Sequence, residues 1–168
     1  MADEEKLGID IGGVIIDRVN DKKDTSFFGD NYLNTTPVPG AFEAIKRLVD
    51  ERFHENVYLV SKCGPEVEGK TKKWLEHHQF FERTGVRREN VFFVRDRRDK
   101  AVVCADKGVT HFIDDKLEVL GWVGKVKTMK RKYLFRPRKR EIEEFYQFMD
   151  KNTKIAYAWD VVVSDLLG

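Results

Sequence analysis

The chain has 168 residues, the ordinary size of one domain, and its hydrophobic fraction of 41% is enough for one sizeable core. The charged fraction of 36% is high, but the two signs nearly cancel at +2, so composition does not point to a nucleic-acid partner, and two cysteines are too few for a disulfide framework. No apolar run approaches the ~18 residues of a transmembrane helix, and residues 1–6 lack the features of a signal peptide. We therefore predict a single cytoplasmic domain over residues 1–168 with no membrane contact. Its oligomeric state stays open.

Short apolar runs alternate along the chain with segments of helical periodicity. The runs predict buried strands at Leu7–Ile11, Val57–Val60, Val91–Val94 and Val109–Ile113, a fifth strand within 126–135 and a short last strand at Ile155–Ala158. The segments between them predict helices at about 41–49, 66–78, 98–107, 117–122, 138–151 and 159–167. This order predicts a three-layer, Rossmann-like α/β fold, in which a parallel sheet of about five strands is covered by helices on both faces.

Polar residues that carry chemistry follow the predicted strands. Asp10 ends the first strand before Gly12-Gly13, Ser61 follows the second, and Asp114 and Asp115 follow the fourth. Ligands of open parallel sheets bind beyond the carboxyl ends of the strands, so these residues are expected to surround one cleft. Three carboxylates repel one another unless a cation lies between them, and oxygen ligands beside a phosphate favour Mg²⁺.

The same cleft has candidate phosphate ligands. Ser61, with Lys62 beside it, and Lys100 at the start of the helix before strand four are placed to bind phosphate oxygens by hydrogen bonds and charge. Asp10 is then placed to attack phosphorus, which is covalent catalysis by a carboxylate. Alternative lysines for this role are Lys70, Lys72 and Lys73, but Lys100 is preferred for its position just before strand four.

Structural interpretations compete with these functional ones. Asp114 or Asp115 is also suited to cap the helix that begins near Lys116, and Ser61 to a plain turn. Cys63 lies next to the predicted site, but no histidine partner is evident, so we interpret it as a bystander.

Four motifs in this order resemble those of the haloacid dehalogenase-like (HAD-like) hydrolases. They are Gly8–Ile15, an apolar strand with Asp10 before a glycine pair; Val57–Gly64, a strand ending in Ser61; Asp99–Lys100 at a helix start; and Thr110–Asp115, a strand ending in paired acids. The helix start at 37–40, Pro-Val-Pro-Gly, is also typical of that family. The likeness extends over roughly residues 7–136.

The resemblance implies a role for each matching residue. Asp10 would be the nucleophile that forms an aspartyl phosphate and a ligand of Mg²⁺, and Gly12 would give the ion its backbone carbonyl. Asp114, with Asp115 close by, would complete the metal site. Ser61 and Lys100 would bind the phosphoryl group of a phosphorylated substrate. The implied activity is that of a Mg²⁺-dependent phosphohydrolase.

The first motif departs from the family's phosphatases at Gly12, where they carry a second aspartate that protonates the leaving group and activates water. General acid–base help of this kind is worth about 10² to 10⁴-fold in rate. Three hypotheses follow. The acid comes from elsewhere, from Asp17 or another acid in residues 17–36; the nucleophile does other chemistry, such as carbon–phosphorus or carbon–halogen cleavage; or the domain is catalytically inactive and binds a phosphorylated ligand, nucleic acid or protein partner. Retention of Asp10, Ser61, Lys100, Asp114 and Asp115 favours an enzyme of low or specialised activity.

Two further features bear on the substrate. The segments 17–36 and 61–100 leave no room for a separate cap domain, so we expect an open site that suits a bulky substrate or uses a neighbouring subunit as a lid. Lys125–Arg140 holds nine Lys or Arg and no acid. We favour a basic edge strand for this segment, protected by its charges from pairing with other sheets, over a weak contact with nucleic acid.

Overall fold

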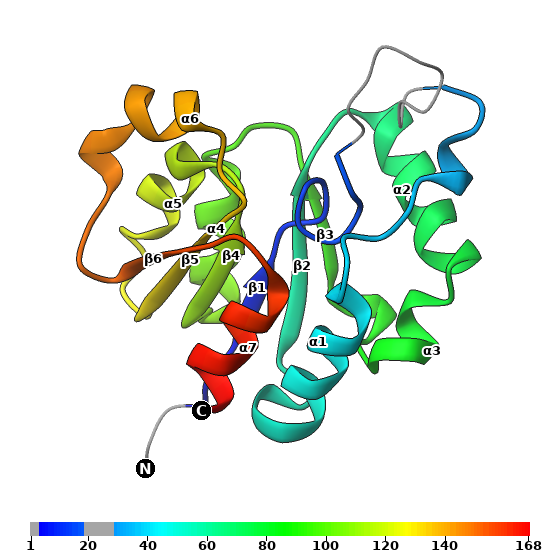
Figure 1. Ribbon diagram of the computed structural model, residues 1–168, viewed down its shortest axis with the longest axis horizontal. Helices are drawn as coiled ribbons and strands as arrows, with labels where there is room; N and C mark the ends of the chain where they lie inside the picture. The colour runs from blue at the N-terminus through cyan, green and yellow to red at the C-terminus, as the bar shows by residue number, and fades with distance from the viewer. Residues whose placement is uncertain (1–3, 19–28) are drawn as a thin grey trace.

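The computed structural model describes residues 4–18 and 29–168, and it confirms the predicted α/β fold. Its strands form one parallel sheet in the order β3-β2-β1-β4-β5-β6 between two layers of helices (Figure 1). The strand bounds are β1 Leu7–Ile9, β2 Val57–Lys62, β3 Val91–Val94, β4 His111–Asp114, β5 Arg131–Phe135 and β6 Thr153–Ala156.

The sheet has six strands where about five were expected. The sixth pairs with β5 from Lys132↔Thr153 to Phe135↔Ala156, so it begins two residues before the predicted Ile155. Thr153 and Lys154 obscure this start in the sequence because they interrupt its apolar pattern.

The helices largely follow the prediction. Their bounds are α1 Ala41–Leu48, continued by a π-helical turn over Val49–Phe53, α2 Pro65–His77, α3 Phe80–Thr84, α4 Asp99–Lys107, α5 Leu117–Val123, α6 Lys139–Glu144 and α7 Trp159–Leu167. Short 3₁₀ turns cover Tyr32–Asn34, Arg88–Asn90 and Tyr146–Phe148. No helix among the described residues is long and apolar enough to cross a membrane.

The predicted single helix over 138–151 is wrong. α6 ends at Glu144, and the chain continues into the 3₁₀ turn at Tyr146–Phe148. The rings of Phe145 and Phe148 stack with their centroids 6.2 Å apart. Phe148 also packs so closely on Gly121 of α5 that a Cβ there would lie 2.3 Å from its ring. This packing on α5 takes precedence over helical continuation.

Alternation along the strands divides the core between the two faces of the sheet. One face packs Leu7 and Ile9 of β1 with α1, α3 and α7, and the other packs Val60 and Phe112 with α4 and α5. On this second face β1 offers only Gly8, and a Cβ there would lie 2.5 Å from the ring of Phe112. The central strand is thus buried on both sides, and its carboxyl end is fixed in position.

The strand order places the predicted site residues at one edge of the sheet. Ile9 pairs with Leu59 of β2 and with Ile113 of β4, so Asp10 lies between the ends of these two neighbours. Reversal of the strand order at β1 makes this edge the expected ligand site of an open α/β sheet.

The interpretation of the basic segment 125–140 as an edge strand is wrong. Its strand, β5, lies inside the sheet between β4 and β6. Lys132 is buried there because its ammonium pairs with Asp150, and Arg131 pairs with Asp165 at 3.1 Å.

No separate cap domain occurs in residues 4–18 and 29–168. Much of the predicted loop at 17–36, including its acids Asp21 and Asp24, lies outside the described residues.

Candidate active site

The loop after β1 holds the predicted nucleophile in a fixed position. The backbone N–H of Asp10 donates to the Ile113 carbonyl at 2.9 Å, and its own Oδ1 accepts the N–H of Ile11 at 2.8 Å. The chain then turns sharply through Gly13, whose φ of 81° is in the left-handed region that favours glycine. A Cβ on Gly13 would lie 2.5 Å from Oδ2 of Asp115, so this glycine also lets the acid of the fourth motif approach.

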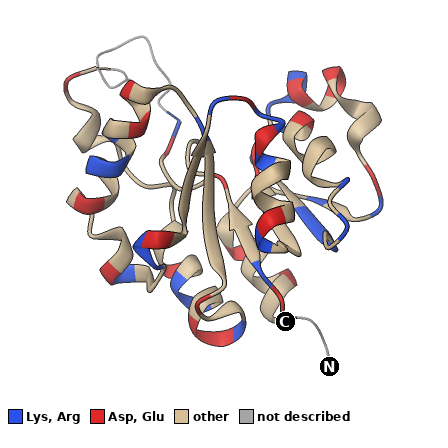
Figure 2. Ribbon diagram, turned by 180° about the vertical axis from the view of Figure 1, so that it is seen from behind, with Lys and Arg blue, Asp and Glu red and all other residues tan. Residues whose placement is uncertain are grey.

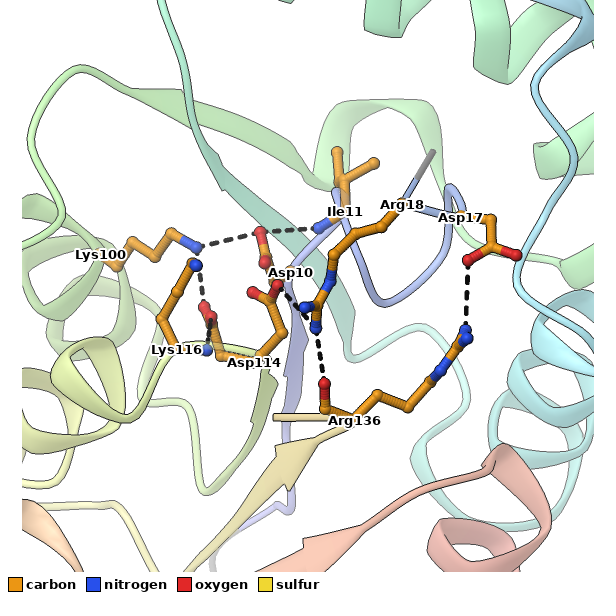
Figure 3. A network of polar contacts seen from close by, with 9 residues as sticks. Asp10, Ile11, Asp17, Arg18, Lys100, Asp114, Lys116 and Arg136 are labelled. Carbon is orange, nitrogen blue, oxygen red and sulfur yellow. Dashed lines mark hydrogen bonds and ion pairs between the residues drawn. The ribbon is translucent and has the colours of Figure 1, made fainter. Parts of the chain in front are cut away.

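Three carboxylates meet at this edge. Asp10, Asp114 and Asp115 are all buried, and each offers an oxygen within 4.8 Å of the others. The Lys100 ammonium lies between two of them, 3.0 Å from Oδ1 of Asp10 and 2.8 Å from Oδ2 of Asp114 (Figure 3). Lys100 is only 3% exposed, so it is not a surface helix lysine.

The cluster carries more negative charge than its surroundings balance. Burial raises the pKa of Asp10 well above its ordinary value, and the Asp114 charge adds to this, while Lys100 opposes it. Burial and the Asp114 charge likewise raise the pKa of Asp115 to about 6. Burial by itself lowers the pKa of Lys100, but the neighbouring carboxylates outweigh burial and raise it overall.

Arg18 is a site residue that sequence reasoning missed. Its guanidinium lies 3.3 Å from Oδ2 of Asp115 and donates from Nη2 to the Arg136 carbonyl at 2.6 Å (Figure 3). The Arg136 side chain in turn lies 3.3 Å from Asp17. No local pattern marks Arg18, because its partner Asp115 is far away in the sequence.

A cavity of about 470 Å³ opens beside the cluster. Of the predicted residues, it brings together Asp10, Gly12, Ser61, Lys62, Lys100 and Asp115, while Asp114 lies behind its wall. Other polar and apolar residues complete the lining: Ile11, Gly13, Ile16, Asp17, Arg18, Cys63, Val67, Thr71, Arg97, Lys116, Val119 and Arg138. The alternatives Lys70, Lys72 and Lys73 are not among the lining residues.

The structural interpretation of Asp114 is also correct in part. Its Oδ1 accepts the backbone N–H of Lys116 at 2.9 Å, just before α5 begins, while its Oδ2 faces Lys100. Asp115 lines the cavity, so it is the more accessible member of the pair.

Cys63 has the environment of a bystander. It is half-buried at the cavity wall, and burial raises the pKa of its thiol. The lining contains no histidine among the described residues to act as its base, and burial outweighs the Arg95 and Lys62 charges that favour the thiolate.

Gly12 differs from its neighbours because its surroundings are open. No heavy atom lies within 4 Å of the place where its Cβ would be, and its φ is not in the left-handed region. A larger side chain would therefore fit at the cavity wall without backbone strain.

The donor set suits a hard divalent cation. Three buried carboxylates form direct ion pairs with only two cations, Lys100 and Arg18. Burial, and after it the Asp114 charge, raises the pKa values of Asp10 and Asp115, and a bound divalent ion would stabilise their charged forms.

By sequence, the chain matches no family model and no curated protein. By structure, it is similar to D,D-heptose 1,7-bisphosphate phosphatase from B. bronchiseptica, crystallised with magnesium and phosphate, at 15% identity and a TM-score of 0.67 over 96% of this chain and 98% of that one. The enzyme of the same name from Burkholderia thailandensis matches at 15% identity and 0.61, over 98% and 99%. A haloacid dehalogenase-like hydrolase from Burkholderia xenovorans matches at 14% and 0.54, over 76% and 58%.

The first two similarities cover nearly the whole chain, and all three are at low identity, so they concern the fold. They agree with the predicted α/β fold and its parallel sheet. The chain therefore has the fold of the haloacid dehalogenase-like phosphatases.

Proposed function

We propose that the chain is a Mg²⁺-dependent phosphohydrolase with Asp10 as its nucleophile. The observation that carries this proposal is the buried Asp10–Asp114–Asp115 cluster, bridged by Lys100 and open to a 470 Å³ cavity. The magnesium and phosphate in the similar structure from B. bronchiseptica support it.

In this proposal a carboxylate oxygen of Asp10 attacks phosphorus, and the bond from phosphorus to the ester oxygen breaks. Water then hydrolyses the aspartyl phosphate, which releases inorganic phosphate and restores the carboxylate. Ser61, Lys62 and Lys100 bind the oxygens of the phosphoryl group.

Asp10, Asp114, Asp115 and the Gly12 carbonyl would hold the Mg²⁺. The ion would supply positive charge to neutralise the phosphoryl oxygens.

Proton transfer to the leaving group is the step for which the cavity offers the fewest suitable residues. Gly12 has no side chain for it, and Asp17 is the one carboxyl group left at the described cavity wall after Asp10 and Asp115. Asp17 is engaged by Arg136 at 3.3 Å. We therefore propose slow or specialised turnover, which favours phosphate esters with good leaving groups.

The rival proposal is a binding protein that uses the same cavity for a phosphorylated ligand or another partner. Gly12 is the observation that supports this rival proposal, because a protein that only binds a ligand needs no acid at position 12. Both proposals expect the same contacts with the ligand. They differ in whether the phosphate group is hydrolysed or stays intact.

The first prediction separates them. With Mg²⁺ and a panel of phosphate esters and phosphonates, wild type should release phosphate, and Asp10→Asn should lower kcat at least 10³-fold because the nucleophile is lost. Released phosphate is measured by colorimetry. Asp106→Asn makes the same chemical change at an exposed position of α4 and should leave turnover unaltered. A wild type inert on the whole panel, or turnover that persists in Asp10→Asn, would count against the enzyme.

The second prediction concerns pH. Asp115 has a pKa of about 6 in the folded chain against an ordinary value of 3.8, so the folded state binds its proton more tightly than the unfolded state does. Without metal, stability should therefore fall as pH rises from about 4 to 6. Mg²⁺ should raise Tm more at pH 7.5 than at pH 5.0, because at the lower pH it must displace that proton.

Thermal melting with 5 mM MgCl₂ against an equal ionic strength of KCl measures this effect, and Asp115→Asn should show a much smaller shift at pH 7.5. Equal shifts at the two pH values would contradict the metal site.

A further inference from the structure

We propose that the cavity binds a small substrate carrying a second phosphate group, and that Lys116 and Arg138 hold that group. This inference rests on the function proposed above, in which Ser61, Lys62 and Lys100 bind the phosphoryl group that is transferred. No motif of the sequence assigns a role to either Lys116 or Arg138.

The first argument is the charge of the cavity wall. Every acid that lines it already faces a cation: Asp10 faces Lys100, Asp17 faces Arg136, and Asp115 faces Arg18. Arg97, a further basic lining residue, is paired with Glu118 at 3.0 Å.

The remaining basic lining residues are Lys62, Lys116 and Arg138, and within the described chain their side chains have neither an ion pair nor a hydrogen bond. The Lys116 charge opposes the burial that raises the pKa of Asp115, but no described acid pairs directly with any of these three cations. Lys62 and Lys100 are sufficient to bind one phosphoryl group. Lys116 and Arg138 therefore remain available for a second anion.

The second argument is position. Lys62 ends β2, on one side of β1, whereas Lys116 follows β4 and Arg138 follows β5, on the other side. Strands lie about 4.8 Å apart, so β5 is roughly 10 Å from β1 across the sheet. A ligand attacked at Asp10 would have to extend across β4 toward β5 to reach Arg138. One phosphate does not extend so far, but a compact molecule with a phosphate at each end does.

The third argument is the way Arg138 is held. Arg136 has a φ of 45°, a strained conformation for a residue with a side chain. Arg18 binds its carbonyl and Asp17 its guanidinium, so the loop that follows Asp10 fixes the start of this segment (Figure 3). Pro137 is buried next to it. Strain of this kind persists where the surroundings enforce it, and here it places Arg138 at the cavity wall.

A small ligand fits better than a polynucleotide. The cavity volume of about 470 Å³ is within the usual range for small-molecule sites. Four other basic residues of the segment 125–140 lie beside acids, since Lys132 pairs with Asp150, Arg131 with Asp165, and Lys139 and Arg140 with glutamates one helical turn away. Figure 2 shows acidic and basic residues interspersed along the ribbon rather than a continuous basic track.

Binding of fructose 1,6-bisphosphate and fructose 6-phosphate, measured by calorimetry with Mg²⁺, tests the inference. The Asp10→Asn protein is used so that the ligand is not consumed, and the result then does not depend on turnover. The bisphosphate should bind at least tenfold more tightly than the monophosphate. Arg138→Met and Lys116→Met, each added to Asp10→Asn, should reduce this ratio at least threefold and leave the monophosphate affinity unchanged.

Lys73→Met is the matched control, because Lys73 is exposed on α2 outside the cavity and the ratio should stay as it was. Melting curves check that each variant is folded. Equal affinities for the two sugars, or a ratio that both cavity variants leave unchanged, would overturn the inference. Tighter binding of a 5′-phosphorylated oligonucleotide than of the bisphosphate would overturn it in favour of a polynucleotide. If wild type is inert but the preference for the bisphosphate over the monophosphate is still found, the proposed function is contradicted and this inference stands.

Discussion

Replacing Lys100 with methionine is expected to destabilise the fold by about 3–5 kcal/mol and to abolish turnover, because the variant leaves two buried carboxylates without their shared cation. The ammonium lies 3.0 Å from Asp10 and 2.8 Å from Asp114, and all three side chains are buried. Methionine keeps much of the side-chain volume, so the loss measures charge rather than packing.

Urea unfolding at pH 7.5 measures the stability change, with Lys73→Met as the exposed control. The difference from wild type should shrink at pH 4, since the pKa of Asp10 is raised and a protonated carboxyl needs no cation. A difference below 1 kcal/mol at pH 7.5, or one that grows on acidification, would show that Lys100 does not neutralise the cluster.

Restoring the missing acid with Gly12→Asp is expected to raise kcat by about 10² to 10⁴-fold, the usual worth of general acid–base help. The position is open to the cavity, with no heavy atom within 4 Å of a Cβ, so the side chain should fit without disturbing the loop. The gain should be largest for esters with poor leaving groups, which most need a proton.

Gly12→Asn is the matched variant, because it has the same size and no carboxyl proton to give. Steady-state phosphate release from a slow and a fast ester compares the three proteins. If Gly12→Asp is no faster than Gly12→Asn, the absence of an acid at position 12 does not limit the reaction.

The local sequence pattern predicts the strands and the polar residues that follow them. Asp10, Ser61 and the acid pair at 114–115 each follow a short apolar run, and the parallel order of these runs places them at one edge of the sheet. The preference for Lys100 over the α2 lysines came from its position before β4, and the structure places it against the acids. Its role toward phosphate remains a prediction.

Contacts between distant segments account for what the sequence did not predict. Arg18 meets Asp115 and Arg136 only after the sheet has formed, so no spacing along the chain reveals it. The end of α6 at Glu144 depends on Phe148 packing on Gly121 of another helix. The charges of the segment 125–140 favour an edge strand, because they would keep an edge from pairing with other sheets, yet β6 covers β5 and Asp150 pairs with Lys132.

Fluorine NMR with beryllofluoride tests most directly whether Asp10 is a nucleophile at a metal site, because BeF₃⁻ mimics a phosphoryl group on an aspartate and the test needs no known substrate. With Mg²⁺ present, wild type should show bound ¹⁹F signals that disappear on addition of EDTA. Asp10→Asn should show none, while Asp106→Asn should match wild type. Absence of a bound signal in wild type, or its persistence in Asp10→Asn, would contradict the account.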